Sequence, residues 1–497
     1  MEIEFRERPM QCLREQAVDV LYQEETAELI VPDSYPDVQA IADSSAICCL
    51  RDQEVLSGSM TASGAFQASV LYTAEGDGAV CALDAYLPFT AKLAREEIGP
   101  DSAGMAELRI RAVDARILNS RKILVRVSYA VRLTAYGKEQ LPLWDTDAGE
   151  PVQLLRVRET GTFPVEAAEK LATFSESIEL PAGEIRKIVK IAPEIQLNER
   201  SIVESRAVVK GNVALHLVYL LENGQLGSFD VQLPVSQYLE LEQDAAGGTL
   251  RTAASFTDFQ LEPEESGGYL VTVGLRLQAV VWKQLELPVI ADGYCPGRGF
   301  EADYESYRIR QSLDEPSMTK NAEGTLRGAI RKLVDCTAWV DFPVCRRSED
   351  EITVGTAVTI HALYYDDEDR LCGETVKTEE SGSFALSEGA ACYADTDQSG
   401  SCFTSMSGDG TLVSCPIAIS ARCFAERELQ GMRSASVGEP LQTAADRPSL
   451  IVRRTNGESS LWSIAKDCGA TVQAIRDANG LGEETPEGGQ LLLIPMV

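Results

Sequence analysis

The chain has 497 residues, with 45 Lys and Arg against 77 Asp and Glu, which gives a formal net charge of −32. This acidic balance argues against nucleic acid and against an anionic membrane surface as partners, because both are bound through clusters of Lys and Arg. Hydrophobic residues make up 44% of the chain. We therefore expect a folded protein with roughly three or four domains, at about 100–200 residues per domain.

The sequence also indicates a compartment. The first ten residues, MEIEFRERPM, lack the apolar segment of a secretion signal, and no run of about 18 apolar residues predicts a transmembrane helix. The 13 cysteines are irregularly spaced, which is typical of reduced thiols rather than of a disulfide framework. We therefore predict a cytoplasmic protein with no transmembrane segment.

One alternating strand recurs three times along the chain. Apolar and polar residues alternate over residues 60–72, 207–219 and 352–364, and each segment ends on a tyrosine. Such alternation places successive side chains on opposite faces of a half-buried β-strand. The end positions are separated by 147 and 145 residues (219 − 72 and 364 − 219), so the chain contains an internal repeat.

A second alternating strand recurs in register with the first, over residues 123–136, 269–282 and 413–424. Each repeat therefore contains several antiparallel strands with one solvent-facing side and one core-facing side. We predict a mostly-β fold of three repeated antiparallel β-sandwich or barrel-like domains, of which the third is divergent. The expected domains are residues 1–150, 151–290 and 291–430.

The pattern changes after the third repeat. From Leu461 to Cys468, apolar residues recur at i, i+3, i+4 and i+7, which predicts one apolar face of a helix that Ser460 or its neighbour caps. A second short helix follows, and a short strand flanks the pair on each side. We predict a small α+β module of βααβ order at residues 449–497, joined to the repeats by a linker at residues 431–448.

This tail resembles a LysM module. The elements LW-x-IA, N-x-L and GQ-L-x-IP occur in the family's order, over residues 451–453, 457–466, 479–481 and 488–495. The resemblance implies a groove that binds a protein partner or a glycan such as peptidoglycan. The groove residues that it implies are Glu458, Ser459, Ser460, Leu461, Trp462, Asn479 and Leu481. Trp462 lies beside the apolar helical face, so it either anchors a partner or packs against the preceding linker or the third repeat.

The repeats resemble SPOCS domains. This resemblance rests on ELIVPDSYPDV at residues 28–38, on the strand at 54–72 with its second copy at 208–219, and on PVIADGYCP at residues 288–296. SPOCS repeats followed by a LysM module are the layout of SipL-like spore-coat assembly proteins. The resemblance implies a non-enzymatic scaffold or adaptor in spore coat (envelope) assembly, in the mother-cell cytoplasm at the forespore surface. It also implies that the LysM module docks a protein partner, the coat-scaffold ATPase.

The two histidines, His216 and His361, lie three residues before equivalent tyrosines, and the first repeat has Ser69 at that position. Both fall on the polar phase of their strands, so we expect solvent-exposed side chains rather than catalytic groups or a shared metal site. The acidic run at residues 366–369 occupies a hairpin-turn position, which favours a solvated turn over a Ca²⁺ loop.

Seven cysteines fall in the third repeat, which leaves a zinc site there as an alternative. They are Cys336, Cys345, Cys372, Cys392, Cys402, Cys415 and Cys423. The chain contains no GxxxxGK[ST], GxSxG or HExxH motif. We therefore predict no catalytic residue, no metal and no cofactor. Two alternatives stay open: glycan binding by the LysM groove and, more remotely, a hydrolase with a site at residues 382–409, where few apolar runs predict a long loop.

Overall fold

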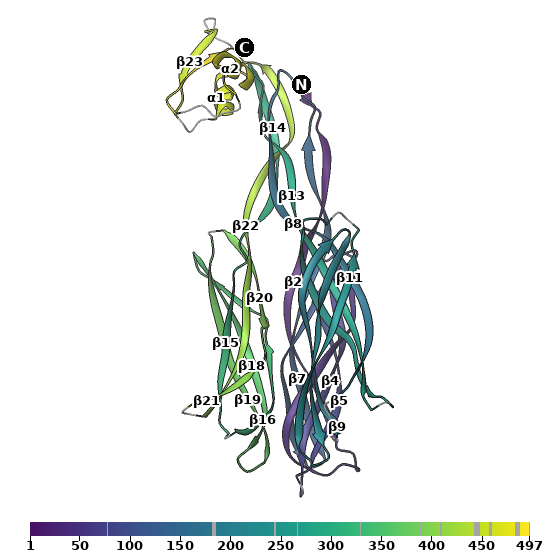
Figure 1. The fold of residues 1–497 in the computed structure, drawn as a ribbon. Coiled ribbons are helices and arrows are strands. Elements are labelled where there is room, and N and C mark those ends of the chain that lie inside the picture. Colours follow the sequence, from purple (N-terminus) through teal and green to yellow (C-terminus); the bar gives the residue numbers. More distant parts are fainter. Residues whose placement is uncertain are drawn as a thin grey trace.

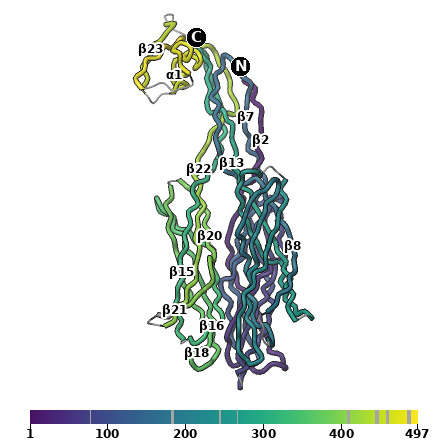
Figure 2. Tube along the Cα trace, in the orientation of Figure 1, coloured from purple at the N-terminus to yellow at the C-terminus, as the bar shows by residue number. Residues whose placement is uncertain are grey.

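The computed structural model describes the chain except for residues 77, 181–184, 243–244, 266, 329, 388, 408–409, 442–447, 457–459, 483–487 and 497. The described residues lie mainly in long β-strands, with two short helices near the C-terminus (Figures 1 and 2). This confirms the expected mostly-β fold that ends in a small α+β module. No helix in this part of the chain is long and apolar enough to cross a membrane.

The first repeat is a sandwich of two three-stranded antiparallel groups. One has the strand order β2-β7-β6 and the other has the order β5-β4-β3. The strands are β2 (Arg6–Ile30), β3 (Val38–Leu56), β4 (Ser59–Ala74), β5 (Val80–Ala94), β6 (Ala103–Asn119) and β7 (Lys122–Asp145). Alternate side chains face inward, so the rings of Phe66, Phe89 and Tyr129 meet in the core with centroids 4.8 to 5.4 Å apart.

The second repeat has the same strand order, with β8-β13-β12 on one side and β11-β10-β9 on the other. Its strands are β8 (Gln153–Ile178), β9 (Ile185–Val203), β10 (Arg206–Leu221), β11 (Leu226–Glu240), β12 (Thr249–Pro263) and β13 (Tyr269–Tyr294). A single parallel bridge between Cys49 and Phe256 joins β3 to β12, so one sheet is continuous from the first repeat to the second.

The third repeat keeps this order, although several of its strands are divided. β14 and β15 pair with one side of β22, and β20 and β21 pair with its other side; β18 lies between β19 on one side and β16 and β17 on the other. The strands are β14 (Arg298–Ser312), β15 (Ser317–Leu326), β16 (Ile330–Val340), β17 (Val344–Arg347), β18 (Glu351–Asp366), β19 (Leu371–Ala385), β20 (Ala390–Gln398), β21 (Phe403–Ser407) and β22 (Gly410–Pro440). The short strand β1 (Glu2–Ile3) also pairs with β22.

The three repeats agree down to the irregularities of their strands. The second strand of each repeat pairs with the third through β-bulges, of which two lie at equivalent positions in all three repeats. In chain order, the residues that directly follow the second of these shared bulges are Asp43, Lys190 and Asp335. They are separated by 147 and 145 residues (190 − 43 and 335 − 190), the same spacings as the recurring tyrosines. A bulge turns the side chains beyond it toward a new direction, so these three positions point alike in their repeats.

The repeats pack around a common axis to which each contributes equivalent residues. One layer on this axis is aliphatic and consists mainly of Ala42, Leu71, Val189, Val218, Val334 and Leu363. Another layer contains the aromatic residues that end the second recurring strand, namely Tyr136, Trp282 and Phe424. The rings of Trp282 and Phe424 lie 5.6 Å apart. The three sandwiches, which we name the body, are therefore arranged with approximate threefold symmetry within a single chain.

The long outer strands of the repeats continue past the sandwiches and form a stalk, which carries the C-terminal module at its tip (Figure 1). The apolar core of the stalk is shared by the three repeats and contains Cys12, Leu143, Phe163, Leu287, Val289, Tyr307, Ile309 and Leu429. Strand β13 extends to Tyr294 and β22 to Pro440, so both strands run across the domain limits expected at residues 290 and 430.

The long loop expected at residues 382–409 is wrong for the part of that segment that the structure describes. Strands β20 and β21 pair with β22 there, and β19 continues to Ala385. The buried residues of β20 are small or polar: Ala390 and Thr396 are both fully buried. Such residues give little apolar signal in the sequence, although the strand is buried against β22.

Candidate functional site

The C-terminal module consists of two helices packed on a two-stranded sheet. Strand β23 (Leu450–Arg454) pairs antiparallel with β24 (Leu491–Pro495), and α1 (Leu461–Cys468) and α2 (Val472–Asn479) lie between them in the chain. The Ser460 hydroxyl caps α1 by accepting a hydrogen bond from the Ser463 backbone N–H at 3.1 Å. The predicted βααβ order and this cap are confirmed.

A polar joint holds the module on the stalk. Asp292, near the end of β13, accepts hydrogen bonds from the Trp462 indole N–H at 2.8 Å and from the Lys466 ammonium at 2.7 Å. The Trp462 ring meets the Tyr294 ring edge-to-face, with centroids 5.0 Å apart, and the Tyr294 hydroxyl donates to the Ala470 carbonyl at 2.8 Å. Trp462 therefore packs against the end of β13, at residues that fall inside the expected third domain of residues 291–430.

The charge of Asp292 suits this joint. Burial alone raises the pKa of its carboxyl, but the hydrogen bonds from Lys466 and Trp462 outweigh burial and hold the pKa below its ordinary value. The carboxylate is thus ionised at neutral pH and attracts the lysine of the module.

Three other predicted groove residues support the fold of the module itself. Leu461 is buried in its core, and Leu481 packs half-buried against the same core. The Asn479 side chain links α2 to β24, since its amide nitrogen donates to the Leu493 carbonyl at 2.6 Å and its oxygen accepts from the Leu493 N–H at 2.7 Å. These side chains therefore have structural partners inside the module.

The remaining predicted groove residues precede α1. Ser460 is exposed at the start of that helix. Glu458 and Ser459 lie outside the described residues. Binding of a partner by any of the seven predicted residues stays a prediction.

The outer face of the module's sheet is apolar and exposed, and sequence analysis did not single it out. Leu450, Val452, Leu491 and Leu493 are 47%, 58%, 65% and 39% exposed. Val452 and Leu493 are cross-strand partners, so these side chains share one side of the sheet, opposite the helices. We name these four residues the apolar face. The sequence signals this face, because each of the two short strands carries apolar residues at both odd and even positions. The helices cover only one side of the two-stranded sheet, so the apolar side chains on the other side stay exposed.

A second cluster lies where the three repeats meet. The Lys190 side chain is 2% exposed, and its ammonium lies 2.8 Å from Asp43 Oδ2 and 2.6 Å from Asp335 Oδ2. Each aspartate also faces a histidine from another repeat: His361 Nε2 lies 2.9 Å from Asp43 Oδ1, and His216 Nε2 lies 2.9 Å from Asp335 Oδ1. We name these five residues the charged centre; they connect all three repeats.

The acids and the lysine of the charged centre stabilise one another's charged forms. Burial raises the pKa of Asp335, but Lys190 and His216 lower it more, and the net pKa is far below the ordinary value. Asp43 behaves alike, because Lys190 and His361 outweigh its burial. Burial lowers the pKa of Lys190, but the two aspartates raise it more, and the net pKa is above the ordinary value. All three groups are therefore ionised at neutral pH.

The expectation of solvent-exposed histidines is wrong for His361, which is only 8% exposed. Alternation places His216 and His361 on the side of their strands away from the apolar phase. In the assembled body this side faces an aspartate of the next repeat instead of solvent. The two histidines also lie in one cluster, although they belong to different repeats.

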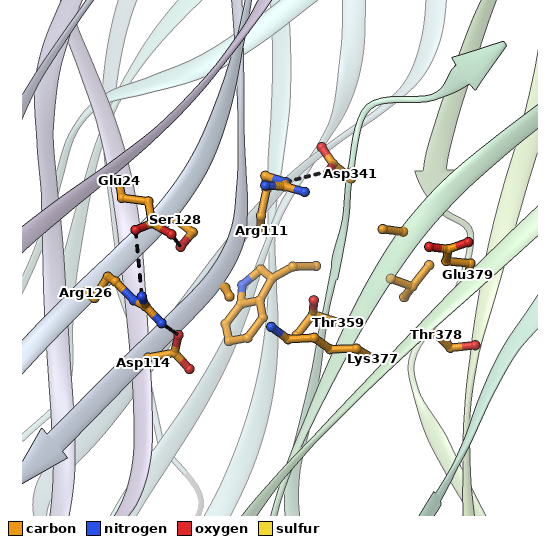
Figure 3. Close-up of a pocket in the computed structure, with 14 residues that line it drawn as sticks. Glu24, Arg111, Asp114, Arg126, Ser128, Asp341, Thr359, Lys377, Thr378 and Glu379 are labelled. Carbon is orange, nitrogen blue, oxygen red and sulfur yellow. Dashed lines mark hydrogen bonds and ion pairs between the residues drawn. The ribbon is translucent and has the colours of Figure 1, made fainter.

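A cavity of about 460 Å³ lies between the first and third repeats (Figure 3). Its charged side chains largely pair with one another: Arg111 contacts Asp341 at 2.5 Å, and Arg126 contacts Asp114 at 2.9 Å. Among the residues that the structure describes, none of the predicted groove residues and none of the segment 382–409 lines this cavity.

The described residues also bear on the metal alternatives. Among them, no group of three or more His, Cys, Asp or Glu side chains is arranged to hold a metal ion. In the acidic turn, the Asp366 carboxylate accepts hydrogen bonds from the backbone N–H groups of Glu368 and Arg370, both at 2.9 Å. This turn joins β18 to β19, so the predicted hairpin turn is confirmed.

Comparison with known proteins identifies the C-terminal module. Residues 455–495 match the model of the LysM domain family. No curated protein and no solved structure matches the chain. The likeness of the repeats to SPOCS domains stays a prediction.

Proposed function

We propose that the chain is a non-enzymatic scaffold whose LysM module is a docking head for a protein partner. The observation that carries the proposal is the apolar face of β23 and β24, with four exposed aliphatic side chains on two five-residue strands. Exposed apolar patches with polar surroundings are typical of protein–protein interfaces. A protein partner gains free energy by burying such a surface, whereas a hydrated glycan gains little from it.

The stalk and its joint support this role. The contacts of Asp292 and Tyr294 fix the module at the tip of the stalk, away from the three sandwiches (Figure 1). A docking head that is already oriented loses less entropy when it binds than a head on a flexible tether.

The resemblance to SipL-like proteins extends the proposal to a process. We propose that the scaffold acts in spore coat assembly, in the mother-cell cytoplasm at the forespore surface, and that the coat-scaffold ATPase is the partner. The net charge of −32 favours a basic surface on that partner, since complementary charge speeds association.

Peptidoglycan binding is the second candidate function, and the LysM family match favours it. The two candidates differ in the surface they need. The protein partner uses the apolar face, whereas the glycan candidate uses the groove that the LysM resemblance implies around Ser460.

The substitutions Val452→Glu and Leu491→Glu test the proposal. Each replaces an exposed side chain, so we expect the module to stay folded. We expect the wild-type chain to bind the purified coat-scaffold ATPase, and each variant to bind it at least about tenfold more weakly, because a charge is then buried in an apolar contact. Gln473→Glu adds the same charge at an exposed position of α2 and is the matched control, expected to bind like the wild type.

Two results would contradict the protein-docking proposal. One is equal affinity of all four proteins for the ATPase. The other is a wild-type chain that ignores the ATPase and sediments with purified peptidoglycan, with Val452→Glu and Leu491→Glu sedimenting equally well. The second result supports the glycan candidate.

A further inference from the structure

The histidines of this chain are few and gathered in one place. Only two occur in 497 residues, and both belong to the charged centre where the three repeats meet. Histidine is the side chain whose ordinary pKa allows a change of charge between about pH 5 and 8. The histidine charge of the whole chain therefore changes at the junction of its repeats.

The histidine contacts run in one direction around the axis of the body. His216 of the second repeat faces Asp335 of the third, and His361 of the third repeat faces Asp43 of the first. Each contact crosses from one sandwich to the next. The protonation state of His216 therefore acts between the second and third repeats.

The third junction follows the same positions with different side chains. Ser69 of the first repeat is equivalent to the histidines, and Lys190 of the second repeat is equivalent to the aspartates. If the third junction has the geometry of the other two, the Ser69 position faces the position of Lys190. A protonated histidine there would be repelled by the lysine, whereas serine carries no charge. Histidines thus occupy the two junctions where the facing residue is an acid.

The charge balance of the centre depends on these protons. With neutral histidines, Lys190 and the two aspartates sum to −1, and one proton on His216 brings the sum to zero. An uncompensated charge costs free energy in a buried site, and the Lys190 site is almost completely buried. Binding of a proton therefore favours the closed junction.

We propose that the charged centre is a proton-operated latch between the repeats, closed when His216 is protonated and loosened when His216 loses its proton. The charged groups that face the histidines are Asp43, Asp230 and Asp335, with Lys190 between two of them. On their other side, His216 Nδ1 lies 2.6 Å from Asp230, within its own repeat, and His361 Nδ1 lies 2.9 Å from the Thr375 hydroxyl.

The direction of the pH dependence follows from His216. Burial lowers its pKa, but Asp335 and Asp230 raise it more, so the net pKa is above the ordinary value. A group with a raised pKa in the folded state stabilises the fold below its unfolded pKa, and this stability is lost as the pH rises through the folded pKa. The aspartates have lowered pKa values, so their contribution is lost only in strong acid. The latch therefore loosens as the pH rises above about 6.5.

Urea unfolding of the full chain between pH 6 and pH 8.5 tests the latch. We expect the wild-type midpoint to fall as the pH rises, with the unfolding equilibrium constant increasing about tenfold for each unit by which folding raises the His216 pKa. The His216→Gln variant should show a flatter dependence. Lys210→Gln, on the same strand but in an exposed ion pair with Glu199, is the matched control and should keep the wild-type dependence.

Two further measurements locate the effect. A histidine-labelled chain gives two imidazole signals, and we expect the signal of His216 to titrate above pH 6.5. Hydrogen exchange, corrected for intrinsic rates, should be faster at pH 8.5 than at pH 6 in β3, β9 and β16, and unchanged in β23. A wild-type midpoint that does not change with pH, or one that falls equally in His216→Gln, overturns the latch. Should that variant not fold, a wild-type His216 pKa at or below 6.5 overturns it.

Discussion

The charged centre of the body and the joint of the head use similar residues in different surroundings. In the body, Lys190 is 2% exposed between two aspartates, whereas in the head joint Lys466 is 44% exposed beside Asp292. Removing one partner of a buried ion pair leaves a buried charge, while an exposed pair contributes little because water replaces it. One pair of residue types can therefore make a buried junction in one place and an exposed joint in another.

The largest effect should follow the loss of the buried cation. Lys190→Met leaves Asp43 and Asp335 facing each other without a cation, and we expect it to lower the free energy of unfolding of the body by about 3–5 kcal/mol. Urea unfolding followed by circular dichroism measures this loss. Lys210→Met removes an exposed lysine and should change the free energy by less than about 0.5 kcal/mol. Equal losses of unfolding free energy in the two variants would contradict the distinction between the buried Lys190 pairs and an exposed ion pair.

A moderate effect should follow a change at the head joint. Asp292→Asn keeps the size of the side chain but removes its charge, and we expect it to weaken attachment of the head by about 1 kcal/mol without changing the unfolding midpoint of the body. Hydrogen exchange in α1 and the fluorescence of Trp462 measure the attachment. Asp467→Asn, an exposed acid of the same helix that pairs with Arg453, should leave both signals unchanged. A lowered body midpoint in Asp292→Asn would show that head and body are not separable.

The smallest effect should come from salt. Raising NaCl from 0.1 M to 1 M shortens the screening length from about 10 Å to about 3 Å. Since Lys466 is exposed to the solvent and Lys190 is not, we expect hydrogen exchange in α1 to increase slightly while that of β9 does not change. If high salt increased hydrogen exchange in β9 but not in α1, the buried Lys190 pairs would be the more sensitive to screening, contrary to this prediction.

The strands and their repetition could be predicted because a half-buried strand leaves a period of two in the sequence. The same alternation led to the wrong expectation for His361. It distinguishes the core-facing side of a strand from the opposite side, but it cannot show that a neighbouring repeat covers the opposite side. Residues 431–437 illustrate a related limit. They looked like a linker, yet Met432 and Val437 are buried in the stalk against residues more than a hundred positions away.

At the candidate site, the helices and the caps of the LysM module could be predicted because capping is a local interaction. The partner of Trp462 could not, because Asp292 lies 170 residues earlier in the chain and no periodicity relates the two positions. The apolar residues of β23 and β24 are evident in the sequence. Which of them are exposed depends on the tertiary structure, because the module covers only one side of its sheet.

The contact between His361 and Asp43 joins residues 318 positions apart (361 − 43), and this separation matters during synthesis. A ribosome adds roughly 5–20 residues per second, so the first two repeats wait roughly 7–30 s while the 140 residues of the third repeat (430 − 290) are made. Until residue 335 has been added, Lys190 has Asp43 but lacks Asp335, and the faces that the completed third repeat covers are open to water. The third repeat is therefore the closing segment of the nascent chain, and the unfinished body is the form that most needs protection from premature association.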